Sequence, residues 1–171
     1  MNNNKLENKC IILPTETTKS IEISKTQKKR IITQSNKWVN VENQFEILQN
    51  KLPKNDYDLI LHQIQQKING YKCQDTIKKL FSIEKFIKID KIIDLLCDCE
   101  MKCFYCKKLV YVLYDNVREP RQWTLERIDN AFGHNMENVV ISCLSCNLKR
   151  RCIYHERFVF TKQLNIIKND S

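Results

Sequence analysis

Glycine and proline are scarce in this sequence, with two glycines and three prolines among 171 residues. Sandwiches and barrels of many short strands need a tight turn at each chain reversal, and these two residues are the common turn formers. Their scarcity therefore argues against an all-β architecture. The sequence also lacks any apolar run of the roughly 18 residues that a membrane-spanning helix needs, so we expect no transmembrane segment.

The first ten residues, MNNNKLENKC, contain no apolar stretch, so we expect no secretory signal. We therefore expect an intracellular protein, in the cytoplasm or nucleus of the host cell. In a reducing compartment, clustered cysteines bind metal more often than they form disulfides. The nine cysteines are an odd number, which excludes complete disulfide pairing.

Positive charge is in excess, since 29 Lys and Arg oppose 20 Asp and Glu to give a net charge of +9. This balance is typical of proteins whose partner is a polyanion, most often nucleic acid. It is equally compatible with a basic, well-solvated surface. Charge alone leaves both interpretations open.

Composition divides the chain into three segments. Residues 1–55 carry ten Lys or Arg against five Asp or Glu and lack a hydrophobic period, which predicts a loosely ordered basic arm with strand-like pieces at 11–13 and 21–23. Residues 56–98 hold seven Lys and seven acidic residues and are expected to form a neutral helical scaffold. Residues 99–171 form a cysteine-rich module.

The basic triplet at 28–30 fits a phosphate contact, an import signal or a solvated charge run.

The hydrophobic period predicts three helices in the scaffold. The first spans residues 56–69 and is expected to stop at Asn69-Gly70. A second starts at Asp75. The third has Ser82 as its N-cap, and the aromatic rings of residues 81 and 86 are expected to pack together as a hydrophobic staple.

The module beyond residue 98 reads as short strands, loops and helices. Residues 109–114 and 123–127 are predicted to be strands joined by a polar hairpin loop. A second loop, 130–138, leads to a short apolar segment, and a basic helix follows it. A final helix is expected to carry Phe158, Val159 and Leu164. The fold class is therefore α+β, with an N-terminal helical region followed by a small α+β module.

Two Cys-x-x-Cys units, with 36 residues between them, provide the strongest signal in the chain. This spacing lets both thiolates of a unit point at one ion, and four thiolates complete a closed tetrahedral shell. A closed shell leaves no position for water or substrate, so the site is expected to hold a structural Zn²⁺. Its predicted ligands are Cys103, Cys106, Cys143 and Cys146.

Five cysteines remain outside this set. Cys97 and Cys99 are expected to be core or half-exposed thiols, because their one-residue spacing suits a metal knuckle poorly. Cys152 and His155 lie three residues apart and fit either a second metal site or two ordinary helix positions. Cys10 and Cys73 carry no spacing signal.

The residues between and after the cysteine pairs include WTLERIDN at 123–130, GHN at 133–135, and single asparagines at 138 and 147. With the cysteine pairs, this arrangement resembles the HNH endonuclease family, whose fold is the treble-clef-like ββα-metal motif. The Glu-Arg-Ile-Asp-Asn run followed by Gly-His and Asn is similar to an HNH variant of phages and large DNA viruses. The resemblance covers about Cys99–Arg151. It implies a metal-dependent phosphodiester hydrolase that acts on DNA.

The resemblance also implies roles for individual residues. By position, Glu126 corresponds to the acidic metal ligand of the family, and Asn138 to the middle Asn that ties the central loop together. Asn147 corresponds to the last metal ligand, next to the second cysteine pair. Oxygen ligands of this kind suit Mg²⁺ or Mn²⁺, which would stabilise the leaving oxygen of the scissile phosphate.

The sequence departs from the family pattern at Arg127, which stands where the family has its general-base His. Arginine cannot accept a proton near neutral pH. His134 is the first substitute, because a neutral imidazole in the loop can activate water. Asp129 is the second, as a base or an additional metal ligand. Each of these residues taken alone also fits an ordinary strand end or solvated loop.

Cations follow the second cysteine pair, at the start of a helix that in this family lies against the nucleic-acid backbone. Contacts of this kind give affinity without sequence information. The residues expected to hold phosphates are Lys149, Arg150, Arg151, Arg118 and Arg121. Trp123 and Phe132 are expected to fill a small core.

Three functions are compatible with these features. The first is an HNH-type DNA endonuclease that leaves 5′-phosphate and 3′-hydroxyl ends, with a structural zinc and a catalytic divalent ion. The second is a catalytically inactive, HNH-derived zinc module that binds nucleic acid. The third is a zinc-stapled protein-interaction module in which the positive charge is incidental.

Overall fold

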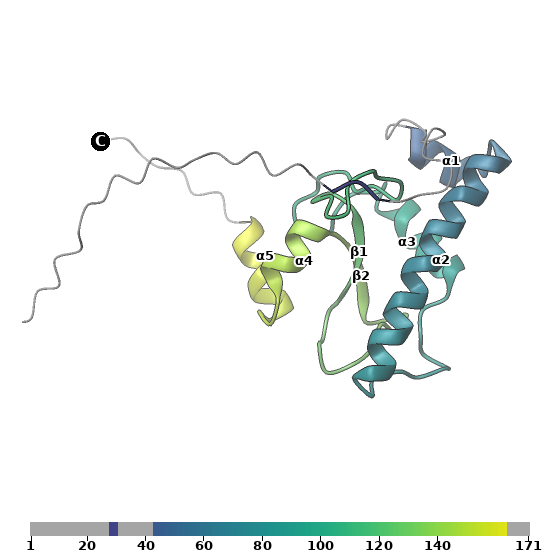
Figure 1. Ribbon diagram of the computed structural model, residues 1–171. Helices are drawn as coiled ribbons and strands as arrows, with labels where there is room; N and C mark the ends of the chain where they lie inside the picture. Colours follow the sequence, from purple (N-terminus) through teal and green to yellow (C-terminus); the bar gives the residue numbers. More distant parts are fainter. Residues whose placement is uncertain (1–27, 31–42, 164–171) are drawn as a thin grey trace, which may run out of the picture.

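The computed structural model describes residues 28–30 and 43–163. In this part of the chain the fold is mixed α+β, as predicted, with five helices and one two-stranded sheet. No helix within these ranges has the length and apolar character to cross a bilayer. The elements in chain order are α1 (Gln44–Asn50), α2 (Lys54–Ile77), α3 (Ile89–Asp98), β1 (Trp123–Arg127), β2 (Val139–Cys143), α4 (Leu144–Arg150) and α5 (His155–Gln163) (Figure 1).

The predicted basic arm contributes two pieces to the described fold. Helix α1 falls inside it and buries Gln44. Arg30 packs on the ring of Tyr114, with its guanidinium carbon 4.2 Å from the ring centroid, and donates to Gln63 Oε1 at 2.8 Å. One residue of the basic triplet is therefore held against the fold, while the two lysines before it are exposed. The strand-like pieces at 11–13 and 21–23, and Leu164, lie outside the described residues.

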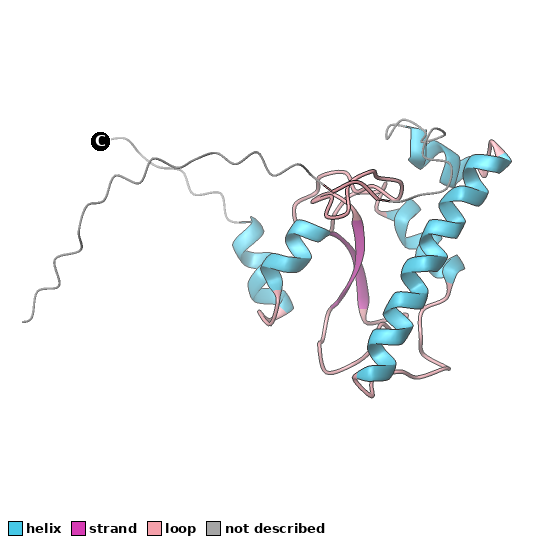
Figure 2. Ribbon diagram, in the orientation of Figure 1, coloured by secondary structure: helices cyan, strands magenta, loops and turns pink. Residues whose placement is uncertain are grey.

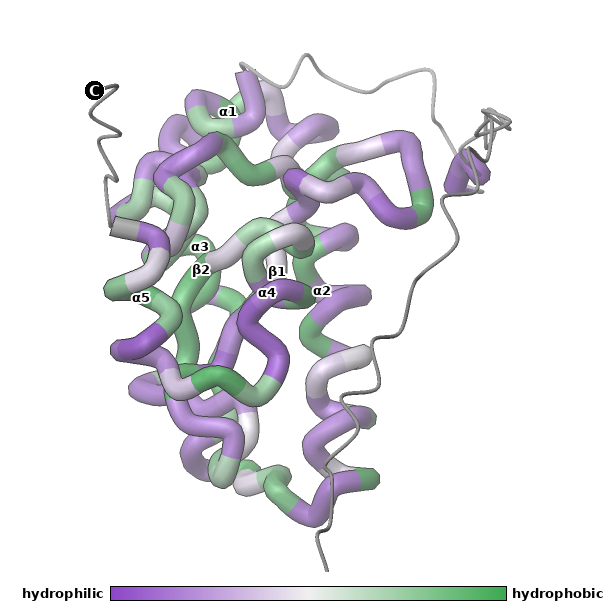
Figure 3. The backbone as a smooth tube through the Cα atoms, turned by 90° about the vertical axis from the view of Figure 1, so that its left-hand side faces the viewer, coloured by the Kyte–Doolittle hydropathy of each residue, from purple (hydrophilic) through white to green (hydrophobic). Residues whose placement is uncertain are grey.

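Helix α2 is one continuous helix of 24 residues, so the predicted stop at Asn69-Gly70 and the separate helix from Asp75 are both wrong. A glycine inside a helix costs about 1 kcal/mol relative to alanine. Burial on both sides of Gly70 offsets that cost, because Ile64 and Ile68 are buried before it and Asp75 after it. Hydrophilic and hydrophobic residues alternate along α2, in keeping with a helix that buries one face (Figure 3).

Helix α3 starts at Ile89, and the prediction of Ser82 as its N-cap is wrong. The backbone before the helix is used elsewhere, since the Ile87 amide donates to the His134 carbonyl at 3.0 Å. Phe81 and Phe86 nevertheless pack together, with ring centroids 5.3 Å apart, as the staple predicts.

The sheet pairs β1 with β2 in antiparallel register, with Trp123 opposite Cys143 and Arg127 opposite Val139. The predicted strand at 109–114 forms only isolated bridges, one of them between Tyr111 and Gln122. Its backbone bonds instead to the buried Gln44 side chain, which accepts from the amides of residues 112 and 113 at 3.0 and 2.9 Å. The hairpin is therefore built from 123–127 and 139–143, and residues 128–138 form the loop that joins them.

Helix α2 covers the open edge of β1, and the two run side by side in Figure 2. Three α2 residues, spaced four apart on one helix face, make the contacts. Lys67 donates from Nζ to the Trp123 carbonyl, and the Tyr71 hydroxyl accepts from the Leu125 amide at 3.0 Å. Asp75 bonds to the loop after β1. An edge strand leaves backbone groups unpaired, and the polar face of α2 satisfies them.

Gly133 is required where this loop meets α2. A Cβ atom at residue 133 would lie 2.6 Å from the Leu80 carbonyl oxygen and 2.7 Å from Asp75 Oδ2. We expect Gly133→Ala to destabilise the protein by about 1–3 kcal/mol, because backbone must shift to admit the methyl group. Urea unfolding measures the change.

Gly70→Ala is the matched control, because a Cβ at residue 70 meets nothing within 4 Å. This substitution lies inside α2 and should stabilise the protein by up to about 1 kcal/mol. Equal stability of the two alanine variants would contradict the close approach of the loop to α2.

Candidate active site and metal centre

Four cysteine sulfurs converge at one end of the sheet, all within 4.8 Å of one another. Cys103 and Cys106 come from the loop after α3, Cys143 ends β2, and Cys146 lies in the first turn of α4. The set forms a cluster that suits a structural metal such as zinc, because four thiols can close a tetrahedral shell. This is the group predicted from the two Cys-x-x-Cys units.

The cluster is tied to the fold by main-chain bonds. The Cys146 amide donates to Cys143 Sγ at 3.4 Å, and the Phe104 amide donates to the Ile141 carbonyl at 2.8 Å. Lys107 adopts a left-handed conformation, with φ of 57°, as the chain leaves the first knuckle. The first knuckle is thereby bonded to β2, so the metal centre and the sheet form one unit.

The other cysteines of the described ranges stand apart from this cluster. Cys97 and Cys99 are half-buried against the hydrophobic core, and Cys73 and Cys152 are exposed. His155 bonds through Nδ1 to the Tyr105 hydroxyl at 3.1 Å, which favours the interpretation of an ordinary helix position over a second metal site. Cys10 lies outside the described residues.

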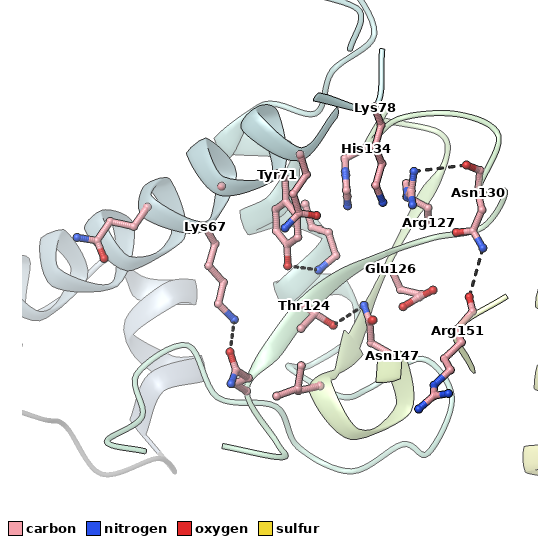
Figure 4. Close-up of a pocket in the computed structure, with 16 residues that line it drawn as sticks. Lys67, Tyr71, Lys78, Thr124, Glu126, Arg127, Asn130, His134, Asn147 and Arg151 are labelled. Atoms are coloured by element: carbon pink, nitrogen blue, oxygen red, sulfur yellow. Dashed lines mark hydrogen bonds between the residues drawn. The ribbon is translucent and has the colours of Figure 1, made fainter. Parts of the chain in front are cut away.

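A cleft of about 580 Å³ opens beside the metal centre, between α2 and α4. Alternate residues of β1, Thr124 and Glu126, contribute to its floor. Asn147 comes from α4, and its side-chain amide donates to the Thr124 hydroxyl at 3.3 Å. Figure 4 shows these side chains together with those of α2 around the same space. The cleft thus brings Glu126 and Asn147, the two metal ligands implied by the resemblance, into one site.

His134 also lines the cleft and is held by Asp75 of α2. Asp75 Oδ1 lies 2.9 Å from His134 Nδ1, and Asp75 Oδ2 accepts from the His134 amide at 2.6 Å. The Tyr71 ring packs on the imidazole, with centroids 4.5 Å apart. A carboxylate at Nδ1 favours the tautomer that is protonated there, which leaves Nε2 as the basic nitrogen. Within the described ranges Nε2 makes no hydrogen bond.

Electrostatics keep this imidazole neutral. Burial lowers the pKa of His134 below its ordinary value of 6.5, although the neighbouring Asp75 acts in the opposite direction. A neutral imidazole near pH 7 is the form that accepts a proton. Asp75 was not foreseen from the sequence, because its role depends on α2 continuing past Gly70 and lying against a loop 59 residues later.

The second candidate base, Asp129, is used inside the loop. Its Oδ1 accepts from the Ala131 amide at 2.8 Å, and it does not line the cleft. Asn138 accepts from the Asp129 amide and donates to the carbonyls of Asp129 and Gly133, at 2.9, 2.9 and 3.0 Å. These are the loop-tying bonds expected of Asn138. The loop between β1 and β2 is thus braced by Asn138, and His134 is the candidate base that faces the cleft.

Glu126 is buried and forms an ion pair with Arg150. Arg150 also donates to the carbonyls of Arg127 and Ile128, each at 2.7 Å. Burial raises the pKa of Glu126 above its ordinary value, although the Arg150 guanidinium acts in the opposite direction. Glu126 Oε2 is buried without a hydrogen-bond partner in the described chain, so this oxygen can accept a bond from a cation or carry a proton.

The prediction that Arg150 holds phosphate needs correction. Its side chain is buried, with 1% of the residue exposed, because its guanidinium is spent on Glu126 and on two carbonyls. Phe132 was expected in the core but is 57% exposed, whereas Trp123 is fully buried as predicted.

Four cations line the cleft, namely Lys67, Lys78, Arg127 and Arg151. Burial, followed by repulsion from Arg30, lowers the pKa of Lys67 to about 7. An anion in the cleft would favour its charged form.

The remaining predicted phosphate contacts, Lys149, Arg118 and Arg121, lie outside the cleft. Lys149 and Arg118 are exposed. Arg121 stacks on the Tyr111 ring at 4.5 Å and donates to the Leu109 carbonyl at 3.1 Å. The cationic surface of the cleft therefore comes from both walls, and α2 supplies a share that the sequence pattern did not reveal.

No protein-family model matches the chain, no curated protein matches its sequence, and no solved structure matches its fold. The functional argument therefore depends on the chemistry of the cleft and of the cysteine cluster.

We expect the purified protein to carry one zinc ion per chain and to lose it in Cys146→Ser. The missing thiolate opens a shell whose structural contribution is on the order of 10 kcal/mol. Elemental analysis gives the zinc content and thermal unfolding gives the stability. Cys73→Ser, at an exposed site away from the cluster, is the control and should retain the metal. A melting temperature that is unaffected by a strong chelator would contradict a structural metal at this position.

Proposed function

We propose that the protein is a metal-dependent endonuclease of the HNH type that hydrolyses phosphodiester bonds in DNA. The observation that carries the proposal is the placement of His134. It is a neutral imidazole, oriented by Asp75, in a cleft lined by four cations and by Glu126 and Asn147. General base, phosphate-binding charge and oxygen ligands are the parts that phosphodiester hydrolysis needs.

In the proposed reaction, His134 Nε2 takes a proton from water as the water oxygen attacks phosphorus. The new bond joins this oxygen to phosphorus, and the bond from phosphorus to the 3′ oxygen breaks. Asp75 accepts the hydrogen bond from Nδ1 throughout and stabilises the imidazolium that forms. Lys78 and Arg127 offset the negative charge on the phosphoryl oxygens. The 3′ oxygen takes its proton from solvent.

The cleft offers oxygen donors for a divalent ion. The Glu126 carboxylate has an unpartnered buried oxygen, and the Asn147 side-chain amide lies in the same cleft, so this pair fits a hard cation such as Mg²⁺ or Mn²⁺. Such an ion would supply positive charge for the leaving oxygen. Asn147 directly follows Cys146 in α4, so the cysteine cluster sets its position.

Arg127 has a role that accounts for its place in the motif. Its Nη1 donates to the Phe132 carbonyl at 3.1 Å and to the Asn130 carbonyl at 3.4 Å. Arg127, at the position where the HNH pattern has its base, therefore braces the loop that carries His134. In this proposal the base has moved from the strand to the loop, and the arginine supports it.

A second candidate is a nucleic-acid-binding module without catalysis, and the Glu126–Arg150 pair favours it. Arg150 already neutralises the carboxylate that would bind the divalent ion, and both groups are buried. In this alternative the cationic cleft binds phosphate, and no bond is broken. Plasmid nicking separates the two candidates.

We expect the protein to nick supercoiled plasmid in Mg²⁺ or Mn²⁺, and His134→Ala to slow nicking by about 100-fold or more, the usual contribution of a general base. Asn147→Ala should cause a comparable loss. Gel electrophoresis of the nicked and linear forms gives the rates. Arg118→Ala is the control, since this exposed arginine lies outside the cleft. Binding without nicking under any divalent ion would instead favour the non-catalytic module.

The pH dependence of nicking follows from the lowered pKa of His134. The base acts only when unprotonated, so the rate should rise with pH through this pKa and level off, with its midpoint below pH 6.5. Asp75→Asn removes the one contact that raises the pKa of His134. The midpoint should therefore move to lower pH while the plateau rate falls.

Initial rates from pH 4.5 to 8 measure both effects. A purely structural contribution of Asp75 would lower the plateau and leave the midpoint in place.

A further inference from the structure

We infer that the cleft takes an unpaired nucleic-acid strand, such as single-stranded DNA or the flap of a branched duplex, in preference to an intact double helix. This substrate class rests on the proposed phosphodiesterase function. The juxtaposition that points to it is a recessed His134 between two cationic walls, one from α2 and one from the β1–α4 side.

The first argument is access to the base. The side chain of His134 is only 6% exposed, packed between Asp75 and the Tyr71 ring. In a duplex, each backbone lies on the outer surface of a wide cylinder, with its paired strand behind it. A phosphate reaches a recessed nitrogen between two walls more readily when its strand enters without a partner.

The second argument is that the α2 wall is fixed. Lys67, Tyr71 and Asp75 fasten one face of α2 to β1 and to the loop after it, over two turns of helix. The wall is therefore part of the folded body of the protein and does not move aside as a lid would. Any substrate has to fit the space that is present, about 580 Å³. Sites of a few hundred cubic ångströms accommodate ligands about the size of a nucleotide.

The third argument is the distribution of charge. Lys67 and Lys78 come from the α2 side, and Arg127 and Arg151 come from the β1–α4 side. In Figure 4, Lys78 lies beside Arg127 and His134, and Lys67 lies beyond Tyr71. A groove with cations on both sides surrounds one backbone, which is the arrangement that proteins use to follow a single strand.

Cleavage of labelled oligonucleotides of one sequence tests the inference. The full-length protein is given a single strand, a blunt duplex and a duplex with a 5′ flap, in Mg²⁺ and in Mn²⁺. We expect the single strand and the flap to be cut at least tenfold faster than the duplex, with cuts in the unpaired part. Lys78→Gln should slow cutting of the single strand. Lys72→Gln, exposed on α2 and outside the cleft, should not.

Fluorescence anisotropy with the same three oligonucleotides, without divalent ions, gives the binding preference separately from cutting. Tighter binding of the single strand, weakened in Lys78→Gln, supports the inference even if no oligonucleotide is cut, and the proposed hydrolysis then fails alone. Cutting and binding of the duplex at least as well as the single strand overturns the inference and leaves the proposed endonuclease standing. Failure to bind any of the three overturns both.

Discussion

The convergence of four cysteine sulfurs is the constraint on which this module depends. Two knuckles, 36 residues apart, are drawn within 4.8 Å of one another. The segment between them is too short to bury a large core, and most of its length is hairpin and loop. A metal in the cluster closes this segment at its ends, so β1, β2 and α4 are held in one arrangement. Asn147, directly after the last cysteine, is positioned by the same constraint.

Helix α2 supplies what the metal module lacks. A two-stranded sheet has an open edge on each side and little capacity to hold a loop in place. The polar face of α2 satisfies the backbone of β1 at the Tyr71 hydroxyl, and Asp75 binds both the backbone and the ring of His134. One helix therefore covers a strand edge, orients an imidazole and forms a wall of the cleft.

The features that followed from the sequence are those set by local spacing. The cysteine cluster depends on residue type and on intervals of two, and the hydrogen bonds of Asn138 stay within nine residues. The features that did not follow depend on contacts between distant segments. Helix α2 continues through Asn69-Gly70 because residues on both sides are buried by other elements. Arg150 looks like a surface cation in sequence, and only the fold shows that Glu126 and two carbonyls enclose it.

The bond between Asp75 and His134 bears on where this protein can be divided. Composition suggests a junction near residue 98, with a self-contained zinc module after it. The carboxylate that orients the imidazole, the ring that packs on it and the lysines of one wall all come from before that junction. A fragment that keeps only the later residues retains its metal ligands but leaves the histidine free to rotate. The candidate site is consequently larger than the motif, and transplanting the motif alone would leave behind the residues that orient His134.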